Sequence, residues 1–200
     1  MGILLQQPAL SINAHDVGWP SYDMWRTIEA PEGTTPGTAA GWIFATNMEA
    51  MKTWKTPLPN IVLNAHGYPG KVSIGGMGHD HIYPSDLSVF GILKPMNVGT
   101  IWLCGCRAAQ GPTGISFCSA LAVITGTQVI ASDTSQEVTP SQAVRYLFLG
   151  AREIDDFEGT VYSFTPGARR TIIDPQRDVA TVEPTTQHAP IIDVDRKPRR

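Results

Sequence analysis

Residues 60–70 read NIVLNAHGYPG, a short apolar run that breaks into a turn rich in glycine and proline. A run of this length, bounded by such a turn, predicts a buried β-strand over 61–65. His66 then stands directly after the strand, and Gly67 allows the backbone to bend sharply at that point. The stretch therefore displays a histidine at the end of a buried strand.

Two further stretches end in a similar way. Residues 100–106 read TIWLCGC and predict a buried strand with Cys106 on the turn that follows it. Residues 128–133 read QVIASD and predict a third strand, which ends at Asp133. Each strand thus ends beside a side chain that can take part in chemistry.

Helical segments alternate with these strands. Apolar residues recur near helical spacing over 38–54, residues 116–125 have helical character, and a further helix is expected to begin at 84–87. Strands that alternate with helices indicate an α/β fold with a mostly parallel sheet. Ligands bind at the carboxyl ends of strands in such sheets. We therefore expect His66 and Cys106 at the same sheet edge.

The remaining segments have weaker patterns. We expect one or two short strands before about residue 36, a hairpin strand at 71–75, a helix at 142–149 and an edge strand or hairpin at 159–164. From about residue 171 the chain mixes prolines with charges and ends in a short basic run, which predicts a flexible tail. The expected organisation is one domain over residues 1–170 and a tail over 171–200.

Composition limits the class of protein. The chain has 200 residues, 42% of them hydrophobic and 16% charged, which fits one globular domain and excludes two large domains or disorder of the whole chain. Its 19 glycines and 16 prolines indicate many turns and disfavour a long helical bundle. The net charge of -3 lacks the positive excess that nucleic-acid binding requires.

The expected localisation is inferred from the membrane-spanning and signal segments that the sequence does not show. No apolar run reaches the roughly 18 residues needed to cross a membrane, and the start of the chain lacks the regions of a secretory signal. The cysteines Cys104, Cys106 and Cys118 are odd in number and give no disulfide framework. We expect a cytoplasmic protein without membrane or nucleic-acid partners, or one exported by a route that uses no cleavable signal.

The residues on the predicted turns suit nucleophilic catalysis. A cysteine attacks as its thiolate and needs a base nearby, and His66 is placed to be that base for Cys106. The main-chain N–H groups of Gly67 and Cys106 are candidates to hold the oxyanion of an acyl-transfer reaction. Cys104 and Cys118 are interpreted as small packing residues.

His79 and His81 are two residues apart, a spacing that places both on one face of a strand, as in some metal sites. No third ligand is evident in the sequence. A polar loop is the preferred interpretation, and neither a metal nor another cofactor is expected.

The sequence around these residues resembles the caspase-like cysteine peptidases of clan CD. Its motifs AHGYPG (65–70), LCGC (103–106) and TGTQVIASD (125–133) are similar, in order, to those of a caspase-like domain family of unknown function from large bacterial surface and repeat proteins. The likeness covers about residues 60–164. Two departures are Ala65, where that family has serine, and Cys104, where it has tyrosine.

The resemblance implies a three-layer α/β/α sandwich with a mostly parallel central sheet. It implies Cys106 as nucleophile, His66 as general base or acid, and Gly67 as an oxyanion-hole donor. Asp133 would lie near the pocket for the residue before the cleaved bond, which would favour arginine or lysine there.

The leading functional hypothesis is a cysteine endopeptidase that cleaves protein or peptide substrates through a thioester. Under this hypothesis the protein is a bacterial effector that processes itself, with self-cleavage near Arg169 and Arg170. One alternative is a non-catalytic interaction or adhesion module on the same scaffold, since a fold does not determine function. The other is an α/β-hydrolase-like esterase, which is disfavoured because Cys104 and Ala108 occupy positions where the nucleophile elbow requires glycine.

Overall fold

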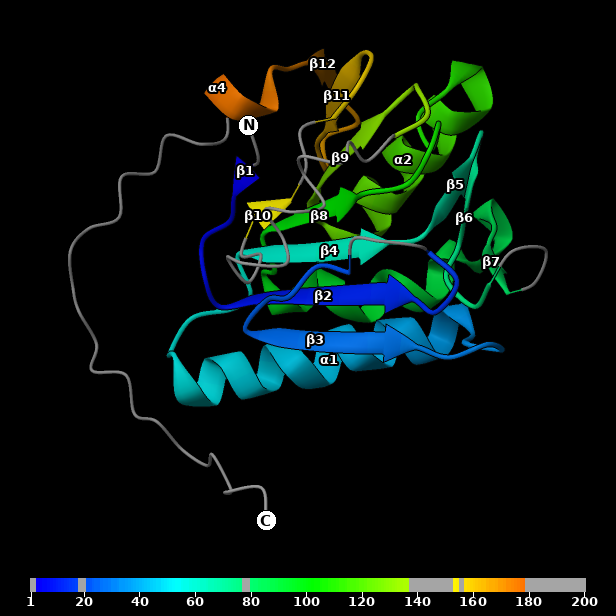
Figure 1. The fold of residues 1–200 in the computed structure, drawn as a ribbon. Helices are drawn as coiled ribbons and strands as arrows, with labels where there is room; N and C mark the ends of the chain where they lie inside the picture. The colour runs from blue at the N-terminus through cyan, green and yellow to red at the C-terminus, as the bar shows by residue number, and fades with distance from the viewer. Residues whose placement is uncertain (1–2, 18–20, 77–79, 137–152, 155–156, 179–200) are drawn as a thin grey trace.

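A computed structural model describes residues 3–17, 21–76, 80–136, 153–154 and 157–178. Its centre is a seven-stranded sheet with the order β12-β11-β9-β8-β4-β2-β3 (Figure 1). The strands are β2 (Ala9–Ala14), β3 (Arg26–Ala30), β4 (Asn60–Asn64), β8 (Thr100–Leu103), β9 (Gln128–Ser132), β11 (Val161–Phe164) and β12 (Arg170–Ile172). The strands from β9 to β3 are parallel, while β11 pairs antiparallel with both of its neighbours, β9 and β12. The prediction of an α/β fold with a mostly parallel sheet is confirmed.

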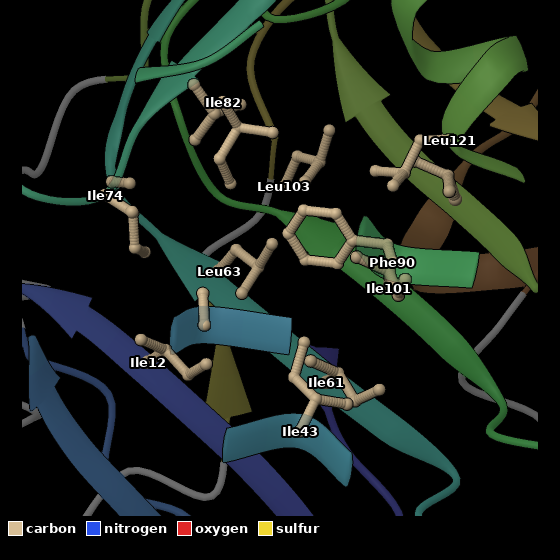
Figure 2. Packing of buried hydrophobic residues seen from close by; sticks show 14 of the residues in the cluster. Ile12, Ile43, Ile61, Leu63, Ile74, Ile82, Phe90, Ile101, Leu103 and Leu121 are labelled. Carbon is tan, nitrogen blue, oxygen red and sulfur yellow. The ribbon is translucent and has the colours of Figure 1, made fainter. Parts of the chain in front are cut away.

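One face of the sheet is covered by helices. These are α1 (Pro36–Thr53), the 3-10 helix η1 (Pro84–Met96) and α2 (Gly111–Thr125), with α1 and α2 both packed against η1. Figure 2 shows the core between the layers, where strand residues such as Leu63 and Leu103 meet Ile43 of α1 and Phe90 of η1. Because strand side chains alternate between faces, every second residue of each central strand contributes to this core.

The second face of the sheet carries a separate apolar cluster. Val62, Trp102 and Ile130 of the central strands pack there against residues from the start of the chain and from β10. The covering pair is β1 (Ile3–Leu4) and β10 (Glu153–Ile154), which are antiparallel. In the ranges that the structure describes, the long helices lie on the first face, so the second layer of helices expected for a three-layer sandwich is not among them.

Most of the regular elements agree with the sequence patterns. The strands β4, β8 and β9 and the helices α1 and α2 occur where they are expected, within a few residues. Helix α1 begins where Thr35 Oγ1 accepts a hydrogen bond from Thr38 N (3.2 Å) and where Pro36 can take the first helical position.

The strand β2 is longer and more deeply buried than the short strands that the sequence predicted for this region. It is buried and lies between β4 and the edge strand β3, although the first 36 residues were expected to be largely irregular. Its polar residues Ser11 and Asn13 interrupt the apolar pattern. Both are buried and donate hydrogen bonds to Tyr22 O, at 2.7 and 3.1 Å, which removes the cost of their burial.

The C-terminal part differs from its prediction. The hairpin expected at 159–164 is present, but its partner β12, not β11, forms the sheet edge. Because β12 is followed by a single helical turn, α4 (Pro175–Asp178), regular structure continues past residue 171, where the tail was expected to begin. The predicted helix at 142–149 and residues 179–200 lie outside the described residues.

The orientation of the strands separates two ends of the molecule. The carboxyl ends of β2, β4 and β8 point toward a small three-stranded antiparallel sheet made of β5 (His66–Tyr68), β6 (Lys71–Ser73) and β7 (His81–Ile82) (Figure 1). The first and last described elements, β1 and α4, lie at the opposite end. No helix within the described ranges has the length and apolar character needed to span a bilayer.

Candidate active site

The turns that follow β4 and β8 are in direct backbone contact. A methyl group on Gly67 would lie 2.8 Å from Cys106 N, and one on Gly105 would lie 2.6 Å from Ala65 O. Neither position has room for a side chain, so both require glycine. The parallel pairing of Leu63 with Leu103 sets the register from which the two turns depart. His66 and Cys106 therefore stand at the same sheet edge, as expected.

The ring of His66 is oriented by Asp16. Its Nε2 atom lies 3.3 Å from Asp16 O and 3.5 Å from Asp16 Oδ2. The two side chains are 28% and 22% exposed, so the contact is screened from bulk water while the site stays reachable. With Nε2 facing Asp16, Nδ1 is the ring nitrogen left for a second partner.

Asp16 was not singled out from the sequence. It follows β2 as His66 follows β4, so it lies at the same carboxyl edge. The signal that identifies it is the position just after a buried parallel strand, and the expectation of one or two short strands before residue 36 did not give that position. The turn at Gly76 lies next to it, since a methyl group there would be 3.7 Å from Asp16 Oδ2.

The thiol of Cys106 contacts the main chain of Gln136. Sγ accepts a hydrogen bond from Gln136 N at 3.4 Å and donates one to Gln136 O at 3.7 Å. Among the described residues, no hydrogen bond joins Cys106 Sγ to the His66 ring. The structure thus places both residues at one edge, with the thiol turned toward the segment after β9.

That segment is held by the side chain of Gln136. Its Oε1 accepts from Glu158 N at 3.1 Å, and its Nε2 donates to Thr134 O at 3.0 Å. A further bond from Arg107 N to Thr134 O (2.9 Å) ties the same segment to the turn that carries Cys106. Gln136 was also missed by the sequence analysis, because its role depends on contacts between distant parts of the chain.

Asp133 lies one strand further along the edge, after β9. Its Oδ1 accepts hydrogen bonds from Thr134 Oγ1 and Thr160 N, both at 2.9 Å, and its Oδ2 accepts one from Tyr162 Oη at 3.4 Å. Burial raises the pKa of this carboxyl, but the hydrogen bonds from Thr160, Thr134 and Tyr162 outweigh burial and hold the pKa below its ordinary value. Asp133 is thus a charged group that is hydrogen-bonded to its neighbour Thr134, to Tyr162 of β11 and to Thr160, the residue before β11.

The other cysteines lie apart from this arrangement. Cys118 is fully buried in α2, where burial raises the pKa of its thiol far above the ordinary value. Its interpretation as a packing residue is confirmed. Cys104 is half-buried and packs against the apolar cluster on the second face.

The histidines near position 80 do not form a recognisable metal site. His81 is buried between the rings of Tyr68 and Tyr83, and His79 lies outside the described residues. Among the residues that the structure describes, no group of three or more histidine, cysteine or acidic side chains is arranged to hold a metal ion.

No protein-family model matches this chain, and a search of curated proteins finds no match either. The fold and the site define an α/β protein with a cysteine, a histidine and an aspartate gathered at the carboxyl edge of a parallel sheet, which is where such folds bind ligands.

Proposed function

We propose that the protein is a cysteine endopeptidase of the caspase-like type, with Cys106 as nucleophile and His66 as general base and acid. The observation that carries the proposal is the backbone contact between Gly67 and the Gly105–Cys106 turn. This contact fixes a thiol, an imidazole and two main-chain N–H groups at one edge of the sheet. The mostly parallel sheet and the order of the sequence motifs support the same class.

In the first half of the reaction, His66 Nδ1 takes the proton of the Cys106 thiol. The thiolate sulfur attacks the carbonyl carbon of the substrate peptide bond, and the carbonyl oxygen becomes an oxyanion that the N–H groups of Gly67 and Cys106 receive. The C–N bond then breaks while His66 returns the proton to the leaving amine. A thioester on Cys106 remains.

In the second half, water replaces the departed amine. His66 removes a proton from the water, the hydroxide attacks the thioester carbon, and the C–S bond breaks with proton return to sulfur. Asp16 keeps the ring in place through both halves, because its contacts with Nε2 leave Nδ1 as the nitrogen for the thiol and stabilise the imidazolium. Asp16 is thus a positioning residue.

The thiol has to leave Gln136 for this chemistry. A cysteine side chain exchanges rotamers about one bond, so the change requires no rebuilding of the backbone. Catalytic hydrogen bonds are often absent or long before substrate binds. Rotation of Sγ from Gln136 toward His66 is therefore the expected first event.

The proposed substrate is a polypeptide with arginine or lysine before the cleaved bond. The negative charge on Asp133, one strand from Cys106, supports this preference. Self-cleavage near Arg169 and Arg170 would in addition require β12 to leave β11, since Arg170 pairs with Phe164.

The alternative is a non-catalytic interaction module on the same scaffold. The observation in its favour is the engagement of the Cys106 thiol by Gln136 in place of His66. The two functions differ in the reactivity of the thiol, which a chemical probe can measure directly.

The test combines an iodoacetamide-type probe with cleavage of an unfolded protein substrate. The wild-type protein should be labelled at Cys106 and should cleave the substrate, while Cys106→Ala and His66→Ala should do neither at a comparable rate. Cys104→Ala is the matched control, because it removes the neighbouring half-exposed thiol and should retain both activities. Labelling that persists in Cys106→Ala, or cleavage that does, would overturn the assignment.

A further inference from the structure

One face of the three-stranded sheet β5-β6-β7 continues outward from the candidate catalytic histidine. His66 and Tyr68 are two residues apart on β5, so their side chains lie on the same face. The register pairs His66 with Ser73 and Tyr68 with Lys71 on β6, and Ser73 with His81 on β7. The other face carries Gly67, Val72 and Ile82, which are buried.

The outward face holds a lysine between two tyrosines. Lys71 Nζ lies 5.0 Å from the ring centre of Tyr68 and 5.3 Å from that of Tyr83. The ring of His81 contacts both tyrosine rings. Its centroid lies 5.6 Å from that of Tyr68 and 5.4 Å from that of Tyr83, and its plane is nearly perpendicular to both. These four residues are called the Lys71 surface. Because two tyrosine rings flank it, the ammonium group is held in place before any ligand arrives.

The charge of Lys71 is not neutralised by the described part of the protein. No carboxylate among the described residues lies within ion-pair distance of Lys71. The nearby Asp86 uses its carboxylate to accept a hydrogen bond from Tyr83 N at 2.9 Å. Tyr83 is 43% exposed, Lys71 and Tyr68 are half-buried and His81 is buried, so the surface is open to solvent at Tyr83 and in part at Lys71 and Tyr68. A preorganised, unneutralised cation on an exposed aromatic surface fits an anionic partner.

The position of the Lys71 surface indicates which kind of anion it would bind. Consecutive residues of a strand rise about 3.3 Å, so Tyr68 lies about 7 Å beyond His66 along β5. An extended peptide has the same repeat, so a side chain two residues from the cleaved bond reaches the same distance. The aromatic walls would contact the CH2 groups of a glutamate while Lys71 receives its carboxylate.

We infer that the Lys71 surface is a specificity site that binds an acidic side chain of the substrate polypeptide, two or three residues from the cleaved bond. This inference rests on the proposed function. It adds an acidic determinant that the sequence did not indicate.

The test uses sets of peptides that differ only at positions two and three from the cleaved bond, on either side, with Glu, Gln or Lys. On the side that crosses β5, the wild-type protein should cleave the Glu peptide about threefold to fivefold more efficiently in kcat/KM than the Gln peptide, as expected for an exposed ion pair. Lys71→Glu should reverse the order and favour Lys, while cleavage of the Gln peptide changes less than about twofold. Added salt should reduce the preference.

Lys52→Glu is the control, since it reverses the charge of an exposed lysine on α1, away from the Lys71 surface. It should keep the wild-type preference. Equal cleavage of the three peptides by the wild-type protein, or an unchanged preference in Lys71→Glu, would overturn the inference while leaving the peptidase intact.

Failure of the proposed function has a different signature. If no peptide is cleaved by any variant, binding of the same peptides to Cys106→Ala, measured by fluorescence anisotropy, decides the inference separately. Tighter binding of the Glu peptide that is reversed by adding Lys71→Glu supports an acidic-peptide site. Equal binding of the Glu and Lys peptides refutes it.

Discussion

Gln136 N lies 3.4 Å from Cys106 Sγ, and Gln136 O accepts the hydrogen bond of the same thiol at 3.7 Å. The two residues are 30 positions apart in the sequence. The side chain of Gln136 supports the contact, since it bonds to Glu158 and to Thr134 within its own segment. The resting orientation of the thiol thus depends on a residue outside the predicted catalytic pair.

Replacing Gln136 by alanine should make Cys106 react faster. The change removes the side-chain hydrogen bonds that hold the segment over the thiol, each worth about 1 kcal/mol. We expect the rate of alkylation by iodoacetamide, followed by mass spectrometry at constant pH, to rise severalfold. Gln128→Ala removes a comparably half-buried amide at the other end of β9 and should leave the rate unchanged. A slower or equal rate in Gln136→Ala would show that the segment does not restrain the thiol.

Replacing Asp16 by asparagine should impair cleavage more than folding. The side chain is partly exposed, so the fold should tolerate the change, but Nε2 loses its charged partner and the ring loses part of its orientation. A displacement of a catalytic group can lower kcat up to about 100-fold. We expect kcat to fall while KM changes little. Glu32→Gln, an exposed acid in the next connection, should have wild-type kinetics. Equal kcat in Asp16→Asn and the wild-type protein would exclude a positioning role.

Adding a methyl group at Gly67 or Gly105 should destabilise the protein. Each added carbon would lie within 3 Å of backbone atoms of the facing turn, and overpacking of this kind costs about 1–3 kcal/mol or more. The control is Gly41→Ala on α1, where a methyl group meets nothing within 4 Å and a helical alanine should stabilise by about 0.5–1 kcal/mol. Urea unfolding measures both effects. A Gly67→Ala protein as stable as the wild type would contradict the backbone contact.

The contribution of Asp133 to stability should depend on pH. Its folded pKa lies below the ordinary value, so the unfolded state binds the proton more readily. The stabilisation is fully present above the unfolded pKa, about 3.9, and is lost as the pH falls through the folded pKa. The difference in the free energy of unfolding between the wild-type protein and Asp133→Asn should therefore shrink between pH 5 and pH 3.

Tyr162→Phe provides the matched variant for that experiment. It removes the hydrogen bond to Asp133 Oδ2 but keeps those to Oδ1 from Thr134 and Thr160. Its pH dependence should be intermediate. A difference between the wild-type protein and Asp133→Asn that is constant with pH would mean that the carboxylate is not stabilised by these bonds.

The strands and turns that display His66 and Cys106 could be predicted because their signal is local. An apolar run that breaks into glycine has the same meaning wherever it occurs, and the parallel arrangement follows from the alternation with helices. The helical pattern of apolar residues in α1 and α2 was likewise sufficient to predict these two helices. These features need no knowledge of the rest of the chain.

Asp16 and Gln136 could not be predicted for two physical reasons. The strand before Asp16 contains Ser11 and Asn13, whose burial is offset by hydrogen bonds to Tyr22 that no sequence pattern reveals. Gln136 acts through its main chain on a thiol that the fold brings close. Both belong to the site through tertiary contacts alone.

The position of β1 and α4, at the end of the molecule away from the carboxyl edge, has a practical consequence (Figure 1). A surface linkage made next to either element would hold the protein with the turns of His66 and Cys106 directed into solution. Immobilised protein should therefore remain accessible to large polypeptides. A linkage on β5, β6 or β7 would have the reverse effect and block the same turns.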